Sequence, residues 1–373
     1  MKSYKQSIQK GPENKKCSGC GIVLTSDITK SGYTPVIQKA KLCQRCFQLK
    51  HYGKSTIDEN LVSDHVGNVI NSFDFSKVAA FYVCSPCQLP FKANEINEIR
   101  SKAKIFYLVV SKIETLVNNL TNNNLVKQKI YDLVNKCGIT LETNQIIPCS
   151  FFKRMNFSQL KQALDYVSSK KIKAAFCGVT NAGKSSLINW ILQKEKVEKT
   201  NLLSTSYHKN TTQDIKQIKT RDFTILDLPG FIDTSGFQSV MSADQLRRFF
   251  TNFSSWKTKI FQLKNDRIFI GEDLFVAEVI IKKFDDKKAS NLICYFNDSL
   301  KIRTGNLKNK SYLKLNDVFK NSNTKTTNIK LNSPYNLIIL NSLGLIVAKN
   351  ISEMSFVTNE AVSEPFVIEN WKI

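Results

Sequence analysis

The sequence predicts an α/β protein in three parts: a zinc-ribbon segment over residues 1–55, a nucleotide-binding domain with a mostly parallel sheet over 56–235, and a β-rich domain over 236–373. Three observations predict this fold class. Two Cys-x-x-Cys pairs lie near the start, and a phosphate-loop pattern follows a strand-like run in the middle of the chain. After residue 236, short β-rich runs alternate with Asn, Asp, Ser and Lys turns, as in antiparallel sheets. The length of 373 residues suits two or three domains, each with its own core.

The composition excludes two classes of protein. With 42% hydrophobic residues the chain is not wholly disordered. No apolar run reaches the roughly 20 residues that a membrane-spanning helix needs. The N-terminus has no apolar stretch of the kind found in secretory signals, so we expect a cytoplasmic location and no membrane partner. In that compartment the ten cysteines should be thiols or metal ligands rather than disulfides.

The charge favours a polyanionic partner. The chain has 54 Lys and Arg against 31 Asp and Glu, a formal net charge of +23. Residues 1–55 are the densest part, with 11 basic and 2 acidic side chains. They are the best candidate for a nucleic-acid contact, and we expect that nucleic acid to be RNA rather than DNA. The abundance of Lys together with Asn, Ile and Phe leaves a general compositional bias as the alternative.

The two cysteine pairs predict a metal site. Cys17-Ser-Gly-Cys20 and Cys43-Gln-Arg-Cys46 can each place two thiolates on a tight turn, and together they would form a tetrahedral S₄ shell around Zn²⁺. A segment this small and polar would depend on the metal for its stability. The alternative is four buried thiols without a metal. The cations and rings around the second pair favour RNA contact, with a solvated face as the alternative; they are Arg45, Phe47, Lys50, His51, Tyr52 and Lys54. A third pair, Cys84 and Cys87, we interpret as packing in a loop, with a redox role as the weaker reading.

A phosphate loop is predicted at residues 178–185. The segment Gly178-Val-Thr-Asn-Ala-Gly-Lys-Ser185 matches GxxxxGK[ST], follows an apolar run and opens a helical stretch, and that context separates a true phosphate loop from chance. Backbone N–H groups would surround the phosphates, Lys184 would reach the β- and γ-phosphates, and Ser185 would hold Mg²⁺. The predicted nucleotide-binding residues here are Gly178, Asn181, Ala182, Gly183, Lys184, Ser185 and Ser186.

Two further motifs follow the phosphate loop. Phe223-Thr-Ile-Leu-Asp-Leu-Pro-Gly230 is a strand that ends in DxxG, where Asp227 would act on Mg²⁺ and Gly230 would offer its N–H to the γ-phosphate. Between the two lies Lys209-Asn-Thr-Thr212, a polar loop in which Thr212 has a hydroxyl for Mg²⁺. Phosphate loop, switch one and switch two in this order are typical of GTPases.

The base-recognition loops of such a site are expected before the phosphate loop. No NKxD or SAK pattern follows Gly230, but the buried-strand run 105–110 ends in Ser111-Lys112-Ile-Glu114, and the run 144–148 ends in Cys149-Ser150. The carboxyl ends of parallel strands meet at one edge of a sheet whatever their order in the chain. A circularly permuted domain would therefore keep the pocket, with Ser111, Lys112, Glu114 and Ser150 around the base.

Through these motifs the chain resembles the YqeH-type circularly permuted GTPases, which are bacterial small-subunit ribosome assembly factors. The likeness covers nearly the whole length, through CSGCG, SGYTP and CQRCFQLKHY, GVTNAGKSSLIN, DLPGF, and the runs 260–263, 268–271 and 343–346. It implies a slowly hydrolysing GTP switch that gates association with rRNA or the small ribosomal subunit. Its C-terminal domain would bind RNA, and GTP or GDP, Mg²⁺, Zn²⁺ and K⁺ would be its ligands.

The chain also departs from that family pattern. Ser111 and Glu114 replace the Asn and Asp of NKxD, so weakened guanine selectivity is expected, and Phe231 stands where other GTPases carry the Gln that positions water. The resemblance implies that Asn181 recruits K⁺, and a loop-stabilising hydrogen bond is the alternative. Lys184, Asn181 and Thr212 are the predicted catalytic residues. Two rival functions stay open: a non-catalytic nucleotide- and RNA-binding scaffold, and an enzyme that also accepts ATP.

Overall fold

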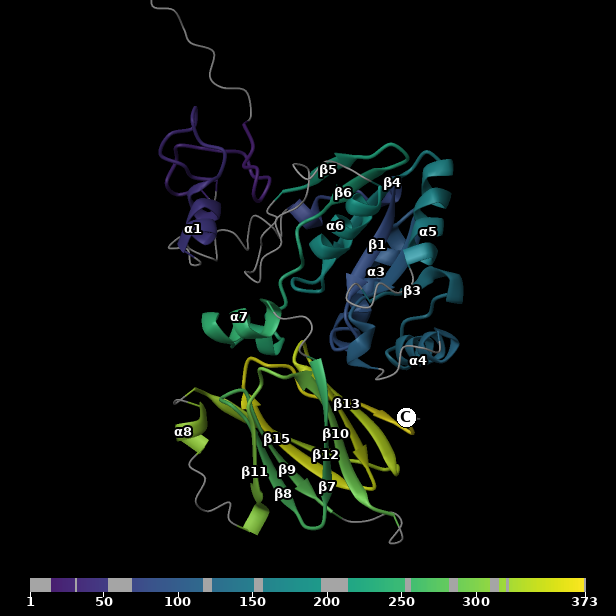
Figure 1. Ribbon diagram of the computed structural model, residues 1–373, viewed down its shortest axis with the longest axis vertical. Coiled ribbons are helices and arrows are strands. Elements are labelled where there is room, and N and C mark those ends of the chain that lie inside the picture. The colour runs from purple at the N-terminus through teal and green to yellow at the C-terminus, as the bar shows by residue number, and fades with distance from the viewer. Residues whose placement is uncertain are drawn as a thin grey trace, which may run out of the picture.

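The computed structural model describes residues 15–30, 32–52, 69–116, 123–150, 157–195, 214–251, 256–281, 288–308, 315–319 and 322–371. Figure 1 shows the cysteine-rich segment with helix α1 (Gln44–Tyr52) at one end of the molecule and the antiparallel sheets at the other. A six-stranded sheet with its helices lies beside the cysteine-rich segment, and α7 (Ala243–Thr251) lies above the antiparallel sheets, on the side of the cysteine-rich segment.

The six-stranded sheet is parallel except at one edge. Its order is β3-β2-β1-β4-β6-β5, and only β5 runs antiparallel to its neighbour. Every residue of β1 is buried, as expected for a strand that helices cover on both faces. The predicted mostly parallel sheet is therefore confirmed. Its strands are β1 (Val78–Cys84), β2 (Ile105–Val110), β3 (Ile146–Pro148), β4 (Lys173–Gly178), β5 (Lys216–Lys219) and β6 (Thr224–Asp227).

The helices of this part pack on the sheet through their apolar faces. In α5 (Phe157–Ser169) the buried residues Leu160, Ala163, Leu164 and Val167 recur at helical spacing and form one face. This part also contains α3 (Ala93–Lys102), α4 (Asn123–Lys136) and α6 (Lys184–Lys194). Short 3₁₀ helices join them: η1 (Phe75–Lys77), η2 (Pro90–Lys92), η3 (Ile113–Thr115), η4 (Thr143–Gln145) and, after β6, η6 (Phe237–Ser239).

The chain order divides the sheet into two halves. Strands β1 to β3 lie on one side of β4, and β6 and β5 lie on the other. The contact between β1 and β4 is therefore where the chain direction across the sheet reverses. Ligands of open α/β sheets bind at the carboxyl ends of the strands at such a point.

The C-terminal part forms two antiparallel five-stranded sheets, as predicted. Their orders are β16-β13-β14-β10-β7 and β11-β8-β9-β15-β12. In the core between the sheets, the centroid of the Phe275 ring lies 5.9 Å from that of Phe296 and 6.4 Å from that of Phe356. The strands are β7 (Trp256–Leu263), β8 (Arg267–Gly271), β9 (Phe275–Ile280), β10 (Ser290–Asn297), β11 (Ile302–Asn306), β12 (Thr324–Lys330), β13 (Tyr335–Leu340), β14 (Gly344–Lys349), β15 (Glu353–Asn359) and β16 (Phe366–Glu369).

The polar, Lys-, Asn- and Thr-rich sequence of the tract 306–332 predicts a long loop, and this prediction is wrong. The tract contains α8 (Leu315–Phe319) and β12, which pairs with β15 along its whole length. Polar residues suit an edge strand, which exposes one side to water, and only Ile329 of β12 is buried. The tertiary pairing, rather than local hydrophobicity, makes this segment a strand.

In the first antiparallel sheet, the inner strand β13 is buried on both faces. Along β13, Leu337 and Ile339 pack in one apolar cluster with the core of the six-stranded sheet, whereas Ile338 and Leu340 pack between the antiparallel sheets. The Phe91 and Phe366 rings also meet, with centroids 6.4 Å apart. The six-stranded sheet and the C-terminal sheets therefore share a continuous apolar core, which opposes free relative motion.

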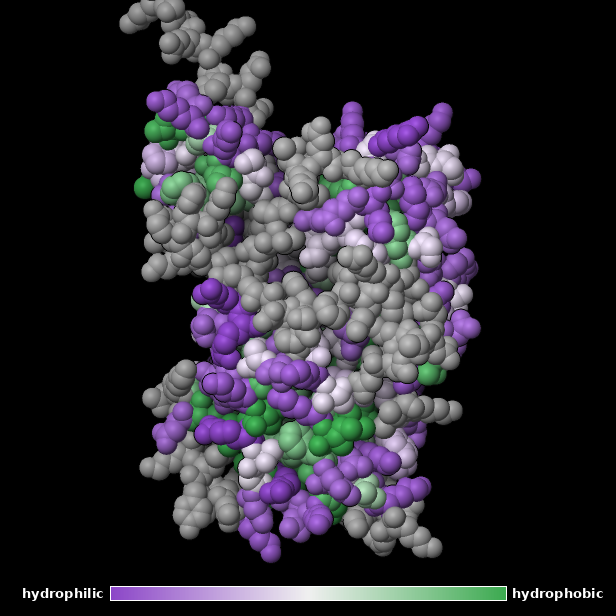
Figure 2. All heavy atoms as spheres, in the orientation of Figure 1, coloured by the Kyte–Doolittle hydropathy of each residue, from purple (hydrophilic) through white to green (hydrophobic). Residues whose placement is uncertain are grey.

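On the face shown in Figure 2, hydrophilic side chains cover much of the six-stranded sheet and its helices, and hydrophobic side chains show among the antiparallel strands. Ile260 of the edge strand β7 is 66% exposed. Within the described residues, no helix combines the length and the apolar character that crossing a membrane requires.

Candidate functional site

The loop between β4 and α6 has a backbone that its glycines permit. Gly178 has φ +134°, and a Cβ there would lie 2.0 Å from the carbonyl oxygen of Val83 on β1. Gly183 caps α6 with φ 95°, and Asn181 is left-handed with φ 62°. The loop therefore lies close against β1 and presents the positive end of α6.

Three consecutive carbonyl groups of this loop accept hydrogen bonds from side chains of other loops. The Gln88 amide lies 3.4 Å from the Thr180 oxygen, the Lys112 ammonium 2.7 Å from the Asn181 oxygen, and the Ser111 hydroxyl 2.6 Å from the Ala182 oxygen. In a trans peptide the N–H points away from the C=O. Anchoring these carbonyls therefore turns the N–H groups of residues 181–183 away from the anchoring loops; the Ala182 N–H donates to the Val179 oxygen at 3.2 Å, and the turn as a whole suits an anion-binding concavity.

Lys184 and Asp227 form a buried ion pair at the first turn of α6. Their side chains are 6% and 0% exposed, and the Lys184 ammonium contacts the Asp227 carboxylate at the end of β6. Removal of either partner would leave a buried charge without its counterion. Ser185 and Ser186 follow in the same turn and are half-buried.

The DxxG strand end lies directly on the phosphate-loop backbone. Thr180 donates its N–H to the Phe231 oxygen at 2.9 Å, and Phe231 donates to the Gly178 oxygen at 3.0 Å. A Cβ on Gly230 would lie 3.0 Å from the Thr180 methyl carbon, so this position favours glycine. Thr212, predicted for Mg²⁺ and catalysis, lies outside the described residues, as does the whole segment 196–213.

The two predicted base loops lie side by side at the next strand ends. Ser111 donates its N–H to the Cys84 oxygen at 2.8 Å, and Cys149 donates to the Val110 oxygen at 2.7 Å, which puts the fully buried Ser150 next to the end of β2. Ser111 and Lys112 reach the phosphate loop by direct hydrogen bonds. The structure thus brings together the 111, 150, 178–186 and 227–230 segments, although the chain separates them.

The loop after β2 contains two ionisable side chains, the buried Lys112 and the half-buried Glu114. Lys112 is left-handed, with φ 54°, and desolvation lowers the pKa of its ammonium to about 8, opposed by the nearby Glu114 carboxylate. One oxygen of Glu114, Oε2, is buried and has no hydrogen-bond partner among the described residues. A buried carboxylate oxygen in that state is suited to accept a hydrogen bond from a bound ligand.

Two glutamines contact the loop and were not found from the sequence. Gln88 accepts from the backbone N–H of Ser85, which orients its amide nitrogen toward Thr180, and Gln238 accepts from the Asn181 side chain at 2.8 Å. Neither belongs to a local motif, so no sequence signal could have identified them. The Asn181–Gln238 bond is the loop-stabilising contact that was the alternative to K⁺ recruitment.

The third cysteine pair packs in the loop that carries Gln88. Cys84 and Cys87 are 0% and 2% exposed. Burial raises the pKa of Cys87 to about 12 and also raises that of Cys84, so both stay thiols at neutral pH. Protonated, inaccessible thiols fit the packing interpretation and not a redox role.

The two N-terminal cysteine pairs come together as predicted. The sulfur atoms of Cys17, Cys20, Cys43 and Cys46 all lie within 4.8 Å of one another, and all four residues are buried. The Cys43 N–H lies 3.2 Å from the Cys17 sulfur, a backbone donor that would stabilise a thiolate. Mutual hydrogen bonds also lower the pKa of Cys17 while raising that of Cys20. Four thiolates in this arrangement fit a tetrahedral ion such as Zn²⁺.

The cysteine segment contacts the edge of the six-stranded sheet. Lys16 pairs with Asp214 at 3.0 Å, the Asp214 N–H lies 3.3 Å from the Cys20 oxygen, and the Lys216 ammonium contacts the Gly19 oxygen. Of the expected RNA-contact residues, Phe47 is 41% exposed, but Arg45 is 3% exposed and cannot belong to such a surface. The side chains at 50–52 and residue 54 lie outside the described part of the chain.

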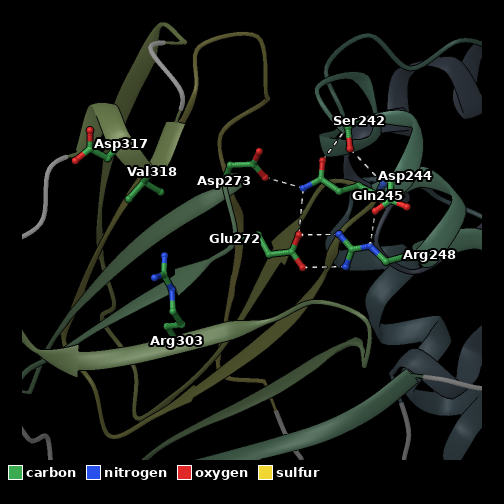
Figure 3. A pocket seen from close by; sticks show the side chains of 9 residues that line it. All are labelled: Ser242, Asp244, Gln245, Arg248, Glu272, Asp273, Arg303, Asp317 and Val318. Atoms are coloured by element: carbon green, nitrogen blue, oxygen red, sulfur yellow. Dashed lines mark hydrogen bonds and ion pairs between the residues drawn. The ribbon is translucent and has the colours of Figure 1, made fainter.

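A pocket of about 370 Å³ lies in the C-terminal part, between α7, the β8–β9 turn, β11 and α8 (Figure 3). Arg248 binds Glu272 through two nitrogens, at 3.0 and 3.2 Å, and Gln245 donates to Asp273 at 2.6 Å. These internal pairs hold α7 to the β8–β9 turn. The lining residues are Ser242, Asp244, Gln245, Arg248, Glu272, Asp273, Arg303, Asp317 and Val318, none of which comes from the phosphate loop.

Comparison with known proteins agrees with this geometry. Residues 173–317 match the family model described as 50S ribosome-binding GTPase. That segment is similar to the P-loop GTPases. The match begins at β4 and continues past the DxxG motif into the antiparallel sheets, and it includes none of β1, β2 or β3.

Two curated relatives are similar over shorter stretches. The chain is 35% identical over 85 residues to the small ribosomal subunit biogenesis GTPase RsgA of Clostridium beijerinckii, which covers 22% of this chain and 29% of that protein. It is 34% identical over 127 residues to GTPase Der of Buchnera aphidicola subsp. Baizongia pistaciae, which covers 27% of this chain and 26% of that protein. The chain therefore spans less than a third of the length of these relatives, and its relation to them is distant.

Proposed function

We propose that this chain binds GTP, hydrolyses it slowly, and uses the nucleotide state to gate its association with rRNA or the small ribosomal subunit. The observation that carries the proposal is the pair of hydrogen bonds from Ser111 and Lys112 to the backbone of Ala182 and Asn181. They join a loop suited to bind a base to a loop suited to bind phosphates.

We also propose that the GTPase domain is circularly permuted. The β4–α6 phosphate loop lies at the centre of the sheet, the base loops follow β2 and β3 on one side, and the DxxG motif follows β6 on the other. The family match that starts only at β4 supports this arrangement, since the base loops then fall outside it. The YqeH-type assignment rests on the motifs quoted above, and so do the domain boundaries near 55 and 235.

The phosphates would be bound by backbone N–H groups of residues 181–186 and by Lys184. Lys184 pairs with Asp227 in the structure, so phosphate binding would draw its ammonium toward the nucleotide. Ser185, Asp227 and Thr212 would hold Mg²⁺, which would offset negative charge on the β- and γ-phosphates. Lys184, Asn181 and Thr212 remain the proposed catalytic residues, and Gly230 the proposed γ-phosphate contact.

The base site would read guanine mainly through Glu114. Its buried Oε2 lacks a partner among the described residues and is suited to accept from the N–H groups on the guanine edge. The Ser111 hydroxyl is already used on the Ala182 oxygen, so it offers no donor to the base. Guanine selectivity would therefore be weaker than with Asn and Asp in these positions, and Lys112 and Ser150 would line the same pocket.

Slow hydrolysis follows from the environment of Phe231. Its ring lies 6.0 Å from that of Tyr82, in a stacked arrangement, and its backbone groups bind the phosphate loop. It has no polar side-chain atom that could orient an attacking water. A partner would then complete the site, and K⁺ beside Asn181 remains part of the proposal.

The ribosomal partner is supported by charge and by the names of the relatives. The net charge of +23 suits rRNA. The family description names the 50S subunit, whereas the RsgA relative is named for the small subunit. We favour the small subunit because the quoted YqeH-type motifs point to it. The cysteine segment, with Zn²⁺ in its S₄ site, and the C-terminal sheets would supply the RNA contacts.

Single-turnover assays test the proposal. GTP, Mg²⁺ and either K⁺ or Na⁺ would be mixed with the protein, with and without small or large ribosomal subunits, and phosphate release measured. Slow release that small subunits accelerate is expected. Binding without release in any condition would favour the scaffold function, which the apolar environment at Phe231 also supports. Equal competition by ATP and GTP would favour the enzyme of relaxed base choice.

A further inference from the structure

A chain of polar side chains links the phosphate loop to the C-terminal sheets. The Asn181 amide donates to Gln238 Oε1 at 2.8 Å, and the Gln238 amide donates to the Ser342 hydroxyl at 3.1 Å. Gln238 lies in η6, eight positions after Gly230, and Ser342 lies in the turn between β13 and β14. Three segments far apart in the chain thus meet at one glutamine.

The surroundings of Gln238 fix its position. Its side chain is 1% exposed, and the preceding residue, Phe237, donates its N–H to the Asn341 oxygen at 3.1 Å. The Ser342 N–H reaches the Cys87 oxygen at 3.3 Å, in the loop that also carries Gln88. A buried side chain with both ends of its amide bonded has little freedom to reorient.

Asn181 is held at both its backbone and its side chain. It has a positive φ in the middle of the phosphate loop, and the Lys112 ammonium binds its carbonyl oxygen. The base loop therefore holds its backbone, and Gln238 holds its side chain. Asparagine adopts the left-handed region more readily than most residues, but at a cost that fixed contacts must offset.

We infer that Gln238 is a positioning residue of the phosphate loop, holding the Asn181 side chain against the β13–β14 turn so that the C-terminal sheets help to set the nucleotide-binding conformation. The inference rests on the proposed nucleotide binding at this loop. Nucleotide binding at the phosphate loop would then change the contacts of the turn at Asn341–Leu343 in the C-terminal part. The inference does not require a swing of the C-terminal sheets, which the shared apolar core opposes.

A double-mutant cycle tests whether Gln238 acts through Asn181. The variants are Gln238→Ala, Asn181→Gly and their combination; glycine is chosen because it tolerates the positive φ of Asn181. We expect Gln238→Ala to weaken GDP affinity about 3- to 10-fold, the effect of one or two net hydrogen bonds. It should weaken affinity no further when Asn181→Gly is already present. An equal additional loss in that background would overturn the inference.

A matched control separates positioning from general destabilisation. Gln245, on α7, is another buried glutamine, 5% exposed, and its amide binds Asp273 rather than the phosphate loop. Gln245→Ala should leave GDP affinity unchanged. A loss equal to that of Gln238→Ala would show a general effect and would contradict a specific role for Gln238.

Hydrogen exchange supplies a measurement that does not depend on hydrolysis. In the wild-type protein, GDP should slow exchange at the amides of Asn341, Ser342 and Leu343, and in Gln238→Ala it should not. If GDP binds the wild type but leaves these amides unchanged, the inference is wrong and the proposed function stands. If the wild type binds no guanine nucleotide, both are wrong.

Discussion

The Ser111 hydroxyl lies 2.6 Å from the carbonyl oxygen of Ala182, although the two residues are 71 positions apart in the chain. This contact joins the end of β2 to the loop after β4, across the intervening strand β1. Lys112 makes the same kind of contact to the adjacent carbonyl of Asn181. The loop that would bind phosphates is therefore shaped partly by the loop that would bind the base.

Replacement of Lys184 should affect both binding and stability. Lys184→Ala should weaken GDP affinity roughly 100-fold or more, because the ammonium contact to phosphate is lost. It should also lower the free energy of unfolding by about 3–5 kcal/mol, because Asp227 is left buried without its counterion. Binding is measured by titration with labelled GDP, and stability by urea denaturation.

The pair Lys184→Met and Asp227→Asn separates the two effects. The double variant should recover most of the lost stability, since no buried charge remains, but should still fail to bind GDP. Recovery of nucleotide binding in the double variant would contradict the assignment of Lys184 to the phosphates.

Glu114 should control the choice of base. Glu114→Ala should lower the ratio of GTP to ATP affinity, because it removes the acceptor proposed for the guanine edge. The apo protein should also lose some stability, because the Glu114 carboxylate favours the charged form of the buried Lys112 ammonium, even though its Oε2 has no partner among the described residues. Competition binding with GTP and ATP measures the ratio, and an unchanged ratio would rule Glu114 out as the base contact. Ser111→Ala serves as the comparison, since it should weaken both nucleotides alike.

Lys112 should contribute a pH-dependent part of the stability. Burial lowers its pKa to about 8, from 10.5 for an exposed lysine, so between these values the unfolded chain binds more protons than the folded one. Stability should therefore rise with pH through that interval, by an amount on the order of 3 kcal/mol, as the penalty for a buried charge disappears. Below pH 8 the penalty is fully present.

Denaturation of Lys112→Met across the same interval provides the test. The difference in the free energy of unfolding between the wild type and this variant should change with pH. For Lys104→Met, which removes an exposed lysine, the difference from the wild type should stay constant. Parallel curves for the wild type and Lys112→Met would show that Lys112 keeps an ordinary pKa.

Gly178 should tolerate no side chain. In Gly178→Ala the new Cβ would lie 2.0 Å from the Val83 oxygen, and φ would stay at +134°, so we expect a loss of more than about 3 kcal/mol. Gly138→Ala is the matched control, because φ there is also positive, at +76°, but no atom lies within 4 Å. That variant should lose only about 1 kcal/mol. Similar losses in both would mean that φ alone, and not the contact with β1, requires the glycine.

The four-cysteine site should hold one metal ion per chain. Purified protein should contain zinc by mass spectrometry, and Co²⁺ substitution should give the absorption bands of tetrahedral thiolate ligation. Cys43→Ser should abolish both, because it removes one of the four sulfurs that lie within 4.8 Å of each other. Cys294→Ser, which alters a buried thiol of the C-terminal sheets, should abolish neither. A wild-type protein that takes up neither ion would contradict the metal assignment.

The sequence indicates the local elements well and their spatial contacts poorly. Residues 174–177, the glycines of the phosphate loop and the helix after Lys184 are predictable because the motif fixes strand, loop and helix in order. The cysteine cluster is predictable because its spacing is a ligand pattern. Gln88 and Gln238 were not predictable, since their roles depend on which loop lies opposite in the folded sheet. For the same reason, the strand β12 was missed: its pairing with β15 decides its structure, and its own polar residues do not.

The order of the strands has a consequence for synthesis of the chain. Strands β1 to β3 leave the ribosome before β4, and the contact between β1 and β4 joins residues such as Val83 and Gly178. Until β4 and the loop after it have emerged, the loops at 111 and 150 lack the phosphate loop that they contact in the folded protein. A nascent chain that ends before Gly178 therefore lacks half of the proposed pocket, and guanine nucleotides, if they bind as proposed, would favour its folding only late in translation.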